Sequence, residues 1–407
     1  MFFTPNKSFK VNLFISILLW MSWLNTSCHQ ASSNNKIGVS KKNNDDSLRS
    51  AEIYKKIAGP EKHRKLDSFF QYKVKNQGFN GAILVAQWGQ ILYKNVYGWA
   101  DYQNQISVTE HTAFQLASTS KPFTAVAIME LIEKGLLSYD DVVQKFFPNF
   151  PYQNVSIKLL LSHRSGLPNY LNFAPIYWKS KGQLMSNVEL MDMMAVHKPI
   201  MASRPDSHFE YCNTNFAVLA AIVEKISGMS FSQYMEQNIF KPLGMNDSWI
   251  YSPENYNRCN DKACGYSRVG WQKGGFDFTD GVTGDKGLYT SISDMWKFDC
   301  ALSEYKLLKK ETLDEAYMPH SFEKPGMKNY GFGWRMIVYS PSVKAVYHNG
   351  WWHQFNNSYF RGLNDRTTVI VLGSNSNFAN YQIQPILDIV SGTKSTATEA
   401  VDEDSEK

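Results

Sequence analysis

"FNGAILVAQWGQILYKNVYGWAD", residues 79–101, holds two apolar runs that meet at Trp88-Gly89. Two runs rich in β-branched and aromatic residues, joined by a short turn, predict a β-hairpin. The residues before them, about 51–76, have the apolar spacing of an amphipathic helix. The folded part of the chain is therefore expected to begin with a helix followed by a hairpin.

Strand-like sequence returns only near the C-terminus. After a long middle block, about 116–320, of helical patches and loops, four β-rich runs follow, and "YQIQPILDIVSG" at 381–392 predicts a closing helix. The four runs are "YGFGWRMIV", "KAVYHNG", "NNSYFRGL" and "RTTVIVLGSN". We expect an α+β fold, in which an antiparallel sheet flanked by terminal helices carries a large, mostly helical insertion. The cleft between these layers is where we expect an active site.

Composition limits the class of protein. The 407 residues are 43% hydrophobic and 19% charged, which allows one large domain or two smaller ones. The net charge of +5 is concentrated in residues 1–60, which hold eight Lys or Arg against three Asp or Glu. The rest of the chain is neutral overall and has no basic stripe, so no nucleic-acid partner is expected.

The N-terminus has the features of an export signal. Lys7 and Lys10 precede "VNLFISILLWMSWL", residues 11–24, a run too short to span a bilayer comfortably. The run ends in "NTSC", which resembles a bacterial lipoprotein signal and would make Cys28 the lipidated first residue. The alternative is a plain secretory signal cleaved near Ser27. Either way we expect a signal peptide over 1–27 and an exported protein.

The flanking segments are polar and without periodicity, so we expect a disordered tether over 28–50 and a disordered acidic tail over 393–407. Lipidation would place the protein in the bacterial periplasm or at the outer membrane, with the lipid at Cys28 as its membrane contact. The sequence indicates no oligomeric state.

The other cysteines give no sign of a metal site. Cys259 and Cys264 lie close together and could be oxidised in an exported protein, although their spacing does not establish a disulfide. Cys212 and Cys300 have apolar neighbours and are expected in the core. No cysteine and histidine cluster has metal-ligand spacing, so neither a metal nor another cofactor is expected.

"HTAFQLASTSKPFTAVAIMELIEKG", residues 111–135, places Ser118 three positions before Lys121 at the start of an apolar segment that Gly135 can end. On a helix these side chains share a face, so Lys121 could help to deprotonate Ser118, whose hydroxyl is otherwise a weak nucleophile. The alternative is an N-cap followed by a solvated lysine. Ser-x-x-Lys occurs at four other serines, but only Ser118 opens a segment expected to be buried. The others are Ser33, Ser303, Ser321 and Ser391.

The motifs "STSK" at Ser118, "YCN" at 211–213 and "HNG" at 348–350 resemble, in order and separation, the three motifs of serine beta-lactamases and penicillin-binding proteins, especially the class C-like group. The resemblance covers about 55–392. It includes "LLLSHRSGLPNY" at 159–170, "FKPLGM" at 240–245, "GDKGLYTSISDMWKF" at 284–298 and "YGFGW" at 330–334. It implies a beta-lactamase-like serine hydrolase domain over 51–392.

The resemblance also implies roles for residues. Ser118 would carry the acyl group, and Lys121 and Tyr211 would move its proton, with the choice of general base left open. A sufficiently buried Lys121 would have its pKa lowered toward neutrality. Asn213 would contact the substrate amide and the lysine, or else cap the helix that follows.

In the third motif, Gly350 would let the substrate backbone lie against the strand edge. The N–H groups of Ser118 and Trp351 would form an oxyanion hole.

His348 departs from the family pattern, because beta-lactamases usually have lysine there. Histidine would bind a substrate carboxylate only as a cation, and otherwise it is a neutral hydrogen-bond partner. His-x-Gly is more similar to D,D-peptidases, D-amino-acid peptidases and esterases of the group. A second departure is Asp206, where glycine is common, and it puts the local loop in doubt. We expect His163 to orient its loop.

The function implied is that of an exported serine acyl-transfer hydrolase that forms an acyl-enzyme at Ser118. Its partner would be a small molecule or peptide with an amide or ester bond: a cell-wall D-peptide, a D-amino-acid peptide or a small ester, with weak beta-lactamase activity as a further option. The alternative is a non-catalytic, penicillin-recognising binding protein. The intact Ser118, Lys121 and Tyr211 favour the enzyme.

Overall fold

The computed structural model describes residues 48–180, 182–323 and 325–393. The predicted signal peptide, Cys28, most of the tether and the acidic tail from 394 onward lie outside these residues. Residues 48–50, which the sequence analysis placed in the tether, are helical. In the described part of the chain, no helix is both long and apolar enough to cross a membrane. The fold that follows is that of residues 54–393.

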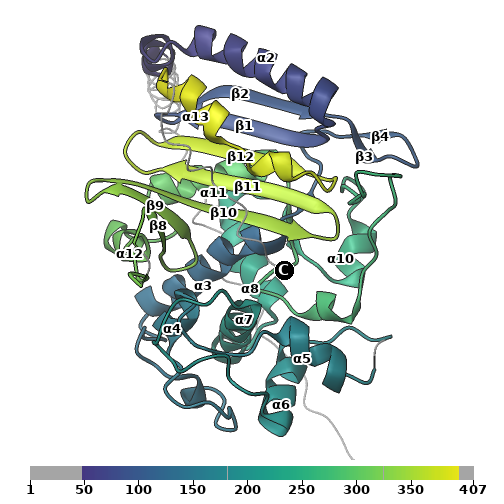
Figure 1. Ribbon diagram of the computed structural model, residues 1–407, viewed down its shortest axis with the longest axis vertical. Helices are drawn as coiled ribbons and strands as arrows, with labels where there is room; N and C mark the ends of the chain where they lie inside the picture. The colour runs from purple at the N-terminus through teal and green to yellow at the C-terminus, as the bar shows by residue number, and fades with distance from the viewer. Residues whose placement is uncertain (1–47, 181, 324, 394–407) are drawn as a thin grey trace, which may run out of the picture. The chain divides into compact units, whose positions relative to one another are not determined.

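Seven strands form one antiparallel sheet in the order β2-β1-β12-β11-β10-β9-β8 (Figure 1). The N-terminal hairpin joins the C-terminal strands where β1 pairs with β12. The predicted α+β fold and its single main sheet are therefore confirmed. The strands are β1 Gly81–Gln87, β2 Gln90–Tyr97, β8 Lys328–Tyr330, β9 Arg335–Ser340, β10 Val343–Trp352, β11 Phe355–Gly362 and β12 Thr367–Gly373.

The hairpin turns where the sequence predicts it. Trp88 and Gly89 both have positive φ angles, 53° and 75°. Two consecutive left-handed residues match the right-handed twist of the strands that they join.

Two terminal helices, α2 Gly59–Gln77 and α13 Gln384–Ser391, cover one face of the sheet (Figure 1). Their apolar side chains pack in one core cluster with those of β1 and β12. The prediction of a single helix over 51–76 was wrong at one point, because the chain turns at residues 57–58 before α2 begins. Ala58 is left-handed there, with φ 55°, and Pro60 is placed where its missing N–H costs no helical hydrogen bond.

The middle of the chain is mostly helical, as expected, and packs against the opposite face of the sheet and beyond its β10 side (Figure 1). Its α-helices are α3 Lys121–Glu133, α4 Ile157–Leu161, α5 Tyr170–Tyr177, α6 Asn187–His197, α7 Asn213–Ser227, α8 Phe231–Met235, α9 Lys241–Leu243, α10 Pro253–Arg258, α11 Ile292–Ser303 and α12 Lys310–Ala316.

Two small sheets were not predicted. One pairs β3 Trp99–Asp101 with β4 Ile106–Ser107, and the other has the order β5-β7-β6. The second consists of β5 Phe114–Gln115, β7 Leu288–Thr290 and β6 Trp249–Ile250. Strands of two or three residues are too short to display alternation. This sheet matters for the site, because it brings the segment before β7 beside the start of α3.

Candidate active site

Ser118 lies in a tight turn between β5 and α3. This 3-10 turn, η1, spans Ala117–Ser120, and α3 begins only at Lys121. The N-cap of α3 is Ser120, so the interpretation of Ser118 as an ordinary helix cap is not supported. Ala117 has a φ angle of 51°, a conformation that disfavours residues with a Cβ atom. The turn thus holds a strained residue immediately before Ser118.

Lys121 is completely buried, which excludes the alternative of a solvated lysine. Its Nζ lies 3.0 Å from Ser118 Oγ, 2.8 Å from Asn213 Oδ1 and 3.0 Å from the carbonyl oxygen of Asp285. A neutral amine has two N–H groups and one lone pair. When the amide and carbonyl oxygens accept the two N–H groups, the lone pair is left for the Ser118 hydroxyl. This geometry suits an amine that takes the proton of Ser118.

Asn213 contacts the lysine instead of capping a helix. It is the first residue of α7, whose N-cap is Cys212 without a side-chain capping bond. Its side-chain oxygen accepts the hydrogen bond from Lys121. Two roles were predicted for this side chain, contact with the lysine or capping of α7. The structure shows the contact with Lys121.

Tyr211 lies over the same lysine. Its ring centroid is 4.9 Å from Lys121 Nζ and also 4.9 Å from Arg335 Cζ. The structure therefore brings Tyr211 to Lys121. It also places Arg335 of β9 there, a residue that was predicted only as part of a strand.

His163 packs against Tyr211 and is hydrogen-bonded to the start of α7. The buried ring packs 4.4 Å from the ring of Tyr211, centroid to centroid, and its Nδ1 accepts hydrogen bonds from the Cys212 N–H at 3.1 Å and from the Asn215 amide at 3.0 Å. Burial, followed by the positive charge of Lys121, lowers the pKa of His163 well below its usual value. A neutral, positioning histidine agrees with the expected structural role.

His348 is also completely buried. Its Nδ1 lies 2.7 Å from the Asn349 carbonyl, which can only accept, so Nδ1 carries the proton and Nε2 accepts from the Tyr330 hydroxyl at 3.2 Å. Burial, and next the charges of Arg335 and Lys121, lower the pKa of His348 well below its usual value. Of the two roles considered for this residue, the structure favours the neutral hydrogen-bond partner.

Gly350 is needed for a reason that differs from the one expected. A Cβ atom there would lie 2.1 Å from the Leu116 carbonyl oxygen and 3.0 Å from Thr119 N. The glycine therefore lets β10 pack against the turn that carries Ser118, whereas the predicted role was to make room for substrate backbone. The Tyr381 hydroxyl donates to the Gly350 carbonyl at 3.0 Å and holds the strand there.

Trp351 follows Gly350 and is 40% exposed. The pairing of β10 with β9 ends at Tyr347 and Arg335, so residues 348–352 extend past β9 beside the Ser118 turn. The oxyanion hole formed by the N–H groups of Ser118 and Trp351 stays a prediction.

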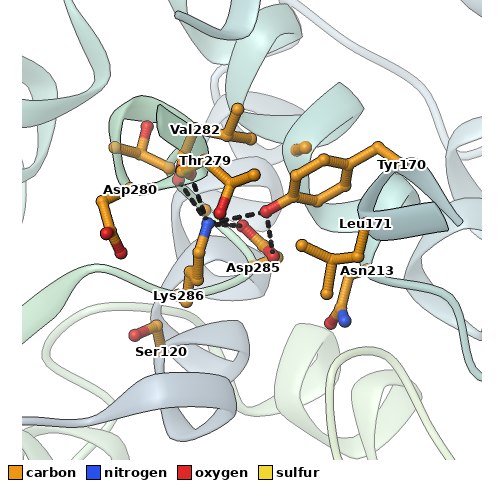
Figure 2. A network of polar contacts seen from close by, with 12 residues as sticks. Ser120, Tyr170, Leu171, Asn213, Thr279, Asp280, Val282, Asp285 and Lys286 are labelled. Carbon is orange, nitrogen blue, oxygen red and sulfur yellow. Dashed lines mark hydrogen bonds and ion pairs between the residues drawn. The ribbon is translucent and has the colours of Figure 1, made fainter. Parts of the chain in front are cut away.

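A buried polar network surrounds the side chains of Asp285 and Lys286, in the segment whose Asp285 carbonyl contacts Lys121 (Figure 2). Lys286 Nζ donates to the Tyr170 hydroxyl at 2.6 Å, and that hydroxyl donates to Asp285 Oδ2 at 2.9 Å. These residues belong to the stretches "LPNY" and "GDKG", for which no role was predicted. The signal in the sequence that could have pointed to this network is the adjacent pair Asp285 and Lys286 between two glycines.

Asp206, which stands where glycine is common in the family, fits the conformation of its loop. Asp206 has a φ angle of 61°, a left-handed conformation in which glycine is most easily accommodated and aspartate is tolerated. Its carboxylate accepts a hydrogen bond from Arg164 Nε at 2.6 Å, and its N–H donates to the Arg164 carbonyl at 2.8 Å. Aspartate in place of the usual glycine is therefore compatible with the loop geometry.

The cysteines of the described residues are free thiols. Cys259 Sγ lies 3.6 Å from the Asp261 carbonyl, and Cys264 Sγ lies 3.6 Å from Asp101 Oδ2. Cys212 is buried as expected, whereas Cys300 is only half-buried.

Comparison with known proteins agrees with this geometry. The sequence pattern of the Beta-lactamase family matches residues 66–387, which include all three motifs. Penicillin-binding protein 4* of Bacillus subtilis (strain 168) is 33% identical over 336 residues, covering 79% of this chain and 74% of that protein. The teichoic acid D-alanine hydrolase of Staphylococcus aureus is 24% identical over 311 residues, covering 76% of this chain and 73% of that protein.

Among solved structures, the octameric penicillin-binding protein homologue from Pyrococcus abyssi superimposes with a TM-score of 0.70 at 26% identity. The match covers 81% of this chain and 77% of that one.

Proposed function

The chain belongs to the beta-lactamase family, and from that premise we propose that it is an exported serine acyl-transfer hydrolase which forms an acyl-enzyme at Ser118. The observation that carries the proposal is the position of the buried Lys121 amine, 3.0 Å from Ser118 Oγ, where it also contacts Asn213 and the Asp285 carbonyl. Serine becomes a nucleophile when a neighbouring base accepts its proton.

The reaction follows from these contacts. Ser118 Oγ attacks the substrate carbonyl carbon while its proton moves to Lys121 or Tyr211, and the carbonyl oxygen becomes an oxyanion that the N–H groups of Ser118 and Trp351 would stabilise. The tetrahedral intermediate collapses, and the amine or alcohol leaves with the proton taken from Ser118. Water then attacks the acyl ester, releases the acid and restores the serine hydroxyl.

The proposed substrates are acyl compounds with an amide or ester bond: cell-wall D-peptides, D-amino-acid peptides or small esters. Two relatives support this range by their names, one being a penicillin-binding protein and the other a teichoic acid D-alanine hydrolase. Because His348 is held neutral, the permanent cation beside Tyr211 is Arg335, which is half-buried. A substrate carboxylate would therefore be attracted by Arg335 rather than by His348.

A chromogenic acyl ester tests the proposal. An initial burst stoichiometric with the enzyme, followed by steady turnover, is the expected result for an acyl-enzyme that hydrolyses. A burst without turnover would instead support the penicillin-recognising binding protein. Absence of both would reject acylation at Ser118. A parallel screen of D-amino-acid peptides, short-chain esters and a cephalosporin identifies the preferred acyl group.

A further inference from the structure

Lys286 is a buried cation whose hydrogen bonds are all made inside the protein. Its Nζ donates to the Tyr170 hydroxyl at 2.6 Å and to the carbonyl oxygens of Thr279 and Val282 at 2.7 and 3.2 Å (Figure 2). Asp285 Oδ1 lies 3.9 Å away, and Tyr170 connects Lys286 to the other carboxylate oxygen. With these partners, Lys286 is not available to bind a substrate.

The segment that carries Lys286 also forms hydrogen bonds with α3 and with Leu116, the residue before the turn η1 that holds Ser118, called here the nucleophile turn. Lys121 donates to the carbonyl of Asp285, and Thr124 donates to the carbonyl of Gly284 at 2.7 Å. Leu116 N–H donates to the carbonyl of Leu288 at 2.8 Å. The direction of the Asp285 carbonyl is therefore part of the environment of Lys121.

Local backbone preference does not set that direction. Asp285 and Lys286 stand between Gly284 and Gly287, whose φ angles are 96° and 89°. Glycine reaches such conformations freely and gives the intervening peptide little resistance to rotation. Hydrogen bonds from Thr124 and from the Tyr251 N–H hold the carbonyls of the two glycines, and the side chains of Asp285 and Lys286 anchor the residues between them.

Lys286 also contacts a residue at the end of β10. Lys286 Nζ lies 5.5 Å from the ring centroid of Trp352, whose Nε1 donates to Asp280 Oδ1 at 3.0 Å. A cation over a tryptophan face is attracted by the ring. The network thus joins α5, the segment 279–286 and β10 around the site.

We infer that Tyr170, Lys286 and the side chain of Asp285 are positioning residues that aim the Asp285 carbonyl at Lys121. This inference rests on the proposed function. With the carbonyl fixed, the lysine amine keeps both N–H groups engaged and its lone pair directed at Ser118. With the carbonyl free to turn, the amine loses this orientation, and misalignment of reacting groups of about 1 Å can slow a reaction by about a hundredfold.

Two substitutions test the inference with a fluorophosphonate probe. Tyr170→Phe removes the hydroxyl that joins Lys286 to Asp285, and Lys286→Met removes the cation while keeping a side chain of similar length. The first-order acylation constant of the bound probe is expected to fall by about tenfold to a hundredfold, while its dissociation constant stays within about twofold. The final labelled fraction should remain that of the wild type.

Lys73→Met is the matched control. Lys73 is another buried lysine, on α2, that donates to the Ala379 carbonyl at 2.5 Å, and its removal should leave the acylation constant unchanged. An unchanged constant in a folded Tyr170→Phe variant would overturn the inference. So would a smaller labelled fraction at the wild-type rate, because that result indicates lost stability alone. A wild-type protein that is never labelled would reject the proposed function itself, and this inference with it.

Discussion

The contacts of Lys121 serve the lysine both before and after it takes a proton. As an amine, it uses two oxygen acceptors and directs its lone pair at Ser118 Oγ. As an ammonium, it has three N–H groups, and the same three oxygens lie within hydrogen-bond distance. The proton can therefore move without rearrangement of the surrounding groups, and such preorganisation lowers the barrier to a charge-forming step.

At the residue scale, we predict that Ser118→Ala abolishes covalent labelling by a fluorophosphonate or penicillin-type probe. The reason is that Ser118 is the serine 3.0 Å from the buried amine of Lys121. Mass spectrometry of the probe-treated protein measures the adduct. Ser391→Ala, which changes another Ser-x-x-Lys serine, should be labelled like the wild type. An adduct on the Ser118→Ala variant would contradict the assignment.

A second residue-scale prediction concerns acid stability. The pKa values of His163 and His348 are held well below their usual range, chiefly by burial, whereas an unfolded histidine binds a proton below about pH 6.5. The unfolded state then binds more protons, so the free energy of unfolding should fall as the pH decreases below about 6.5. Each histidine contributes up to about 1.4 kcal/mol per pH unit.

Urea titrations at pH 7.5 and pH 5.5 measure this loss, which should be smaller in His348→Gln. His111→Gln is the contrasting variant. His111 is exposed, and its hydrogen bond to Asp247 raises its pKa, so its removal can only steepen the acid-side loss. Equal losses in the wild type and His348→Gln would show that His348 is protonated in the folded protein.

The pH dependence of activity should also reflect a neutral His348. With His348 neutral, activity on carboxylate-bearing and on neutral substrates should share one pH dependence over the neutral range. A loss confined to carboxylate-bearing substrates as the pH rises would restore the cationic role.

At the scale of elements, the close contact of β10 with the nucleophile turn, made at Gly350, holds the two elements together at the site. Gly350→Ala would place a Cβ atom 2.1 Å from the Leu116 carbonyl, so β10 and the turn must separate. Overpacking of this kind costs about 1–3 kcal/mol. We expect a lower denaturant midpoint and a large fall in labelling at Ser118.

Gly275→Ala is the control for this change, since a Cβ atom there meets nothing within 4 Å and the backbone is not left-handed. Wild-type labelling of a stable Gly350→Ala variant would show that the close contact is dispensable.

The elements that could be predicted were those with long apolar patterns. The hairpin β1–β2 and strands β9 to β12 were found because their runs are long and bounded by turn residues. β5, β6 and β7 were missed because their pairing depends on residues far apart in the sequence. The site shows the same division: Ser118, Lys121 and Asn213 were found as motifs, whereas the Asp285 carbonyl is a backbone atom without a sequence signature.

At the scale of the whole molecule, we expect the N-terminal residues, which lie outside those that the structure describes, to set the location of the protein. We predict that Cys28 is the lipidated N-terminal residue of the mature protein, because a basic start and a short apolar run precede small residues and the cysteine. Mass spectrometry of the mature N-terminus checks this. Cys28→Ser should give a protein released from membranes by washing. An unmodified Cys28, or cleavage elsewhere, would contradict the prediction.

The pairing of β1 with β12 places Gly81 opposite Gly373, near the two ends of the folded chain. During synthesis, β1 and β2 emerge first. Strand β12, with which β1 pairs, is made only after most of the remaining chain. Contacts of such long range form slowly, because loop closure precedes any gain from pairing. A nascent chain therefore cannot assemble β10 against the Ser118 turn within a finished sheet until translation is nearly over. For the exported hydrolase proposed above, this delay would keep the chain unfolded during translocation and would withhold its activity until the chain is complete.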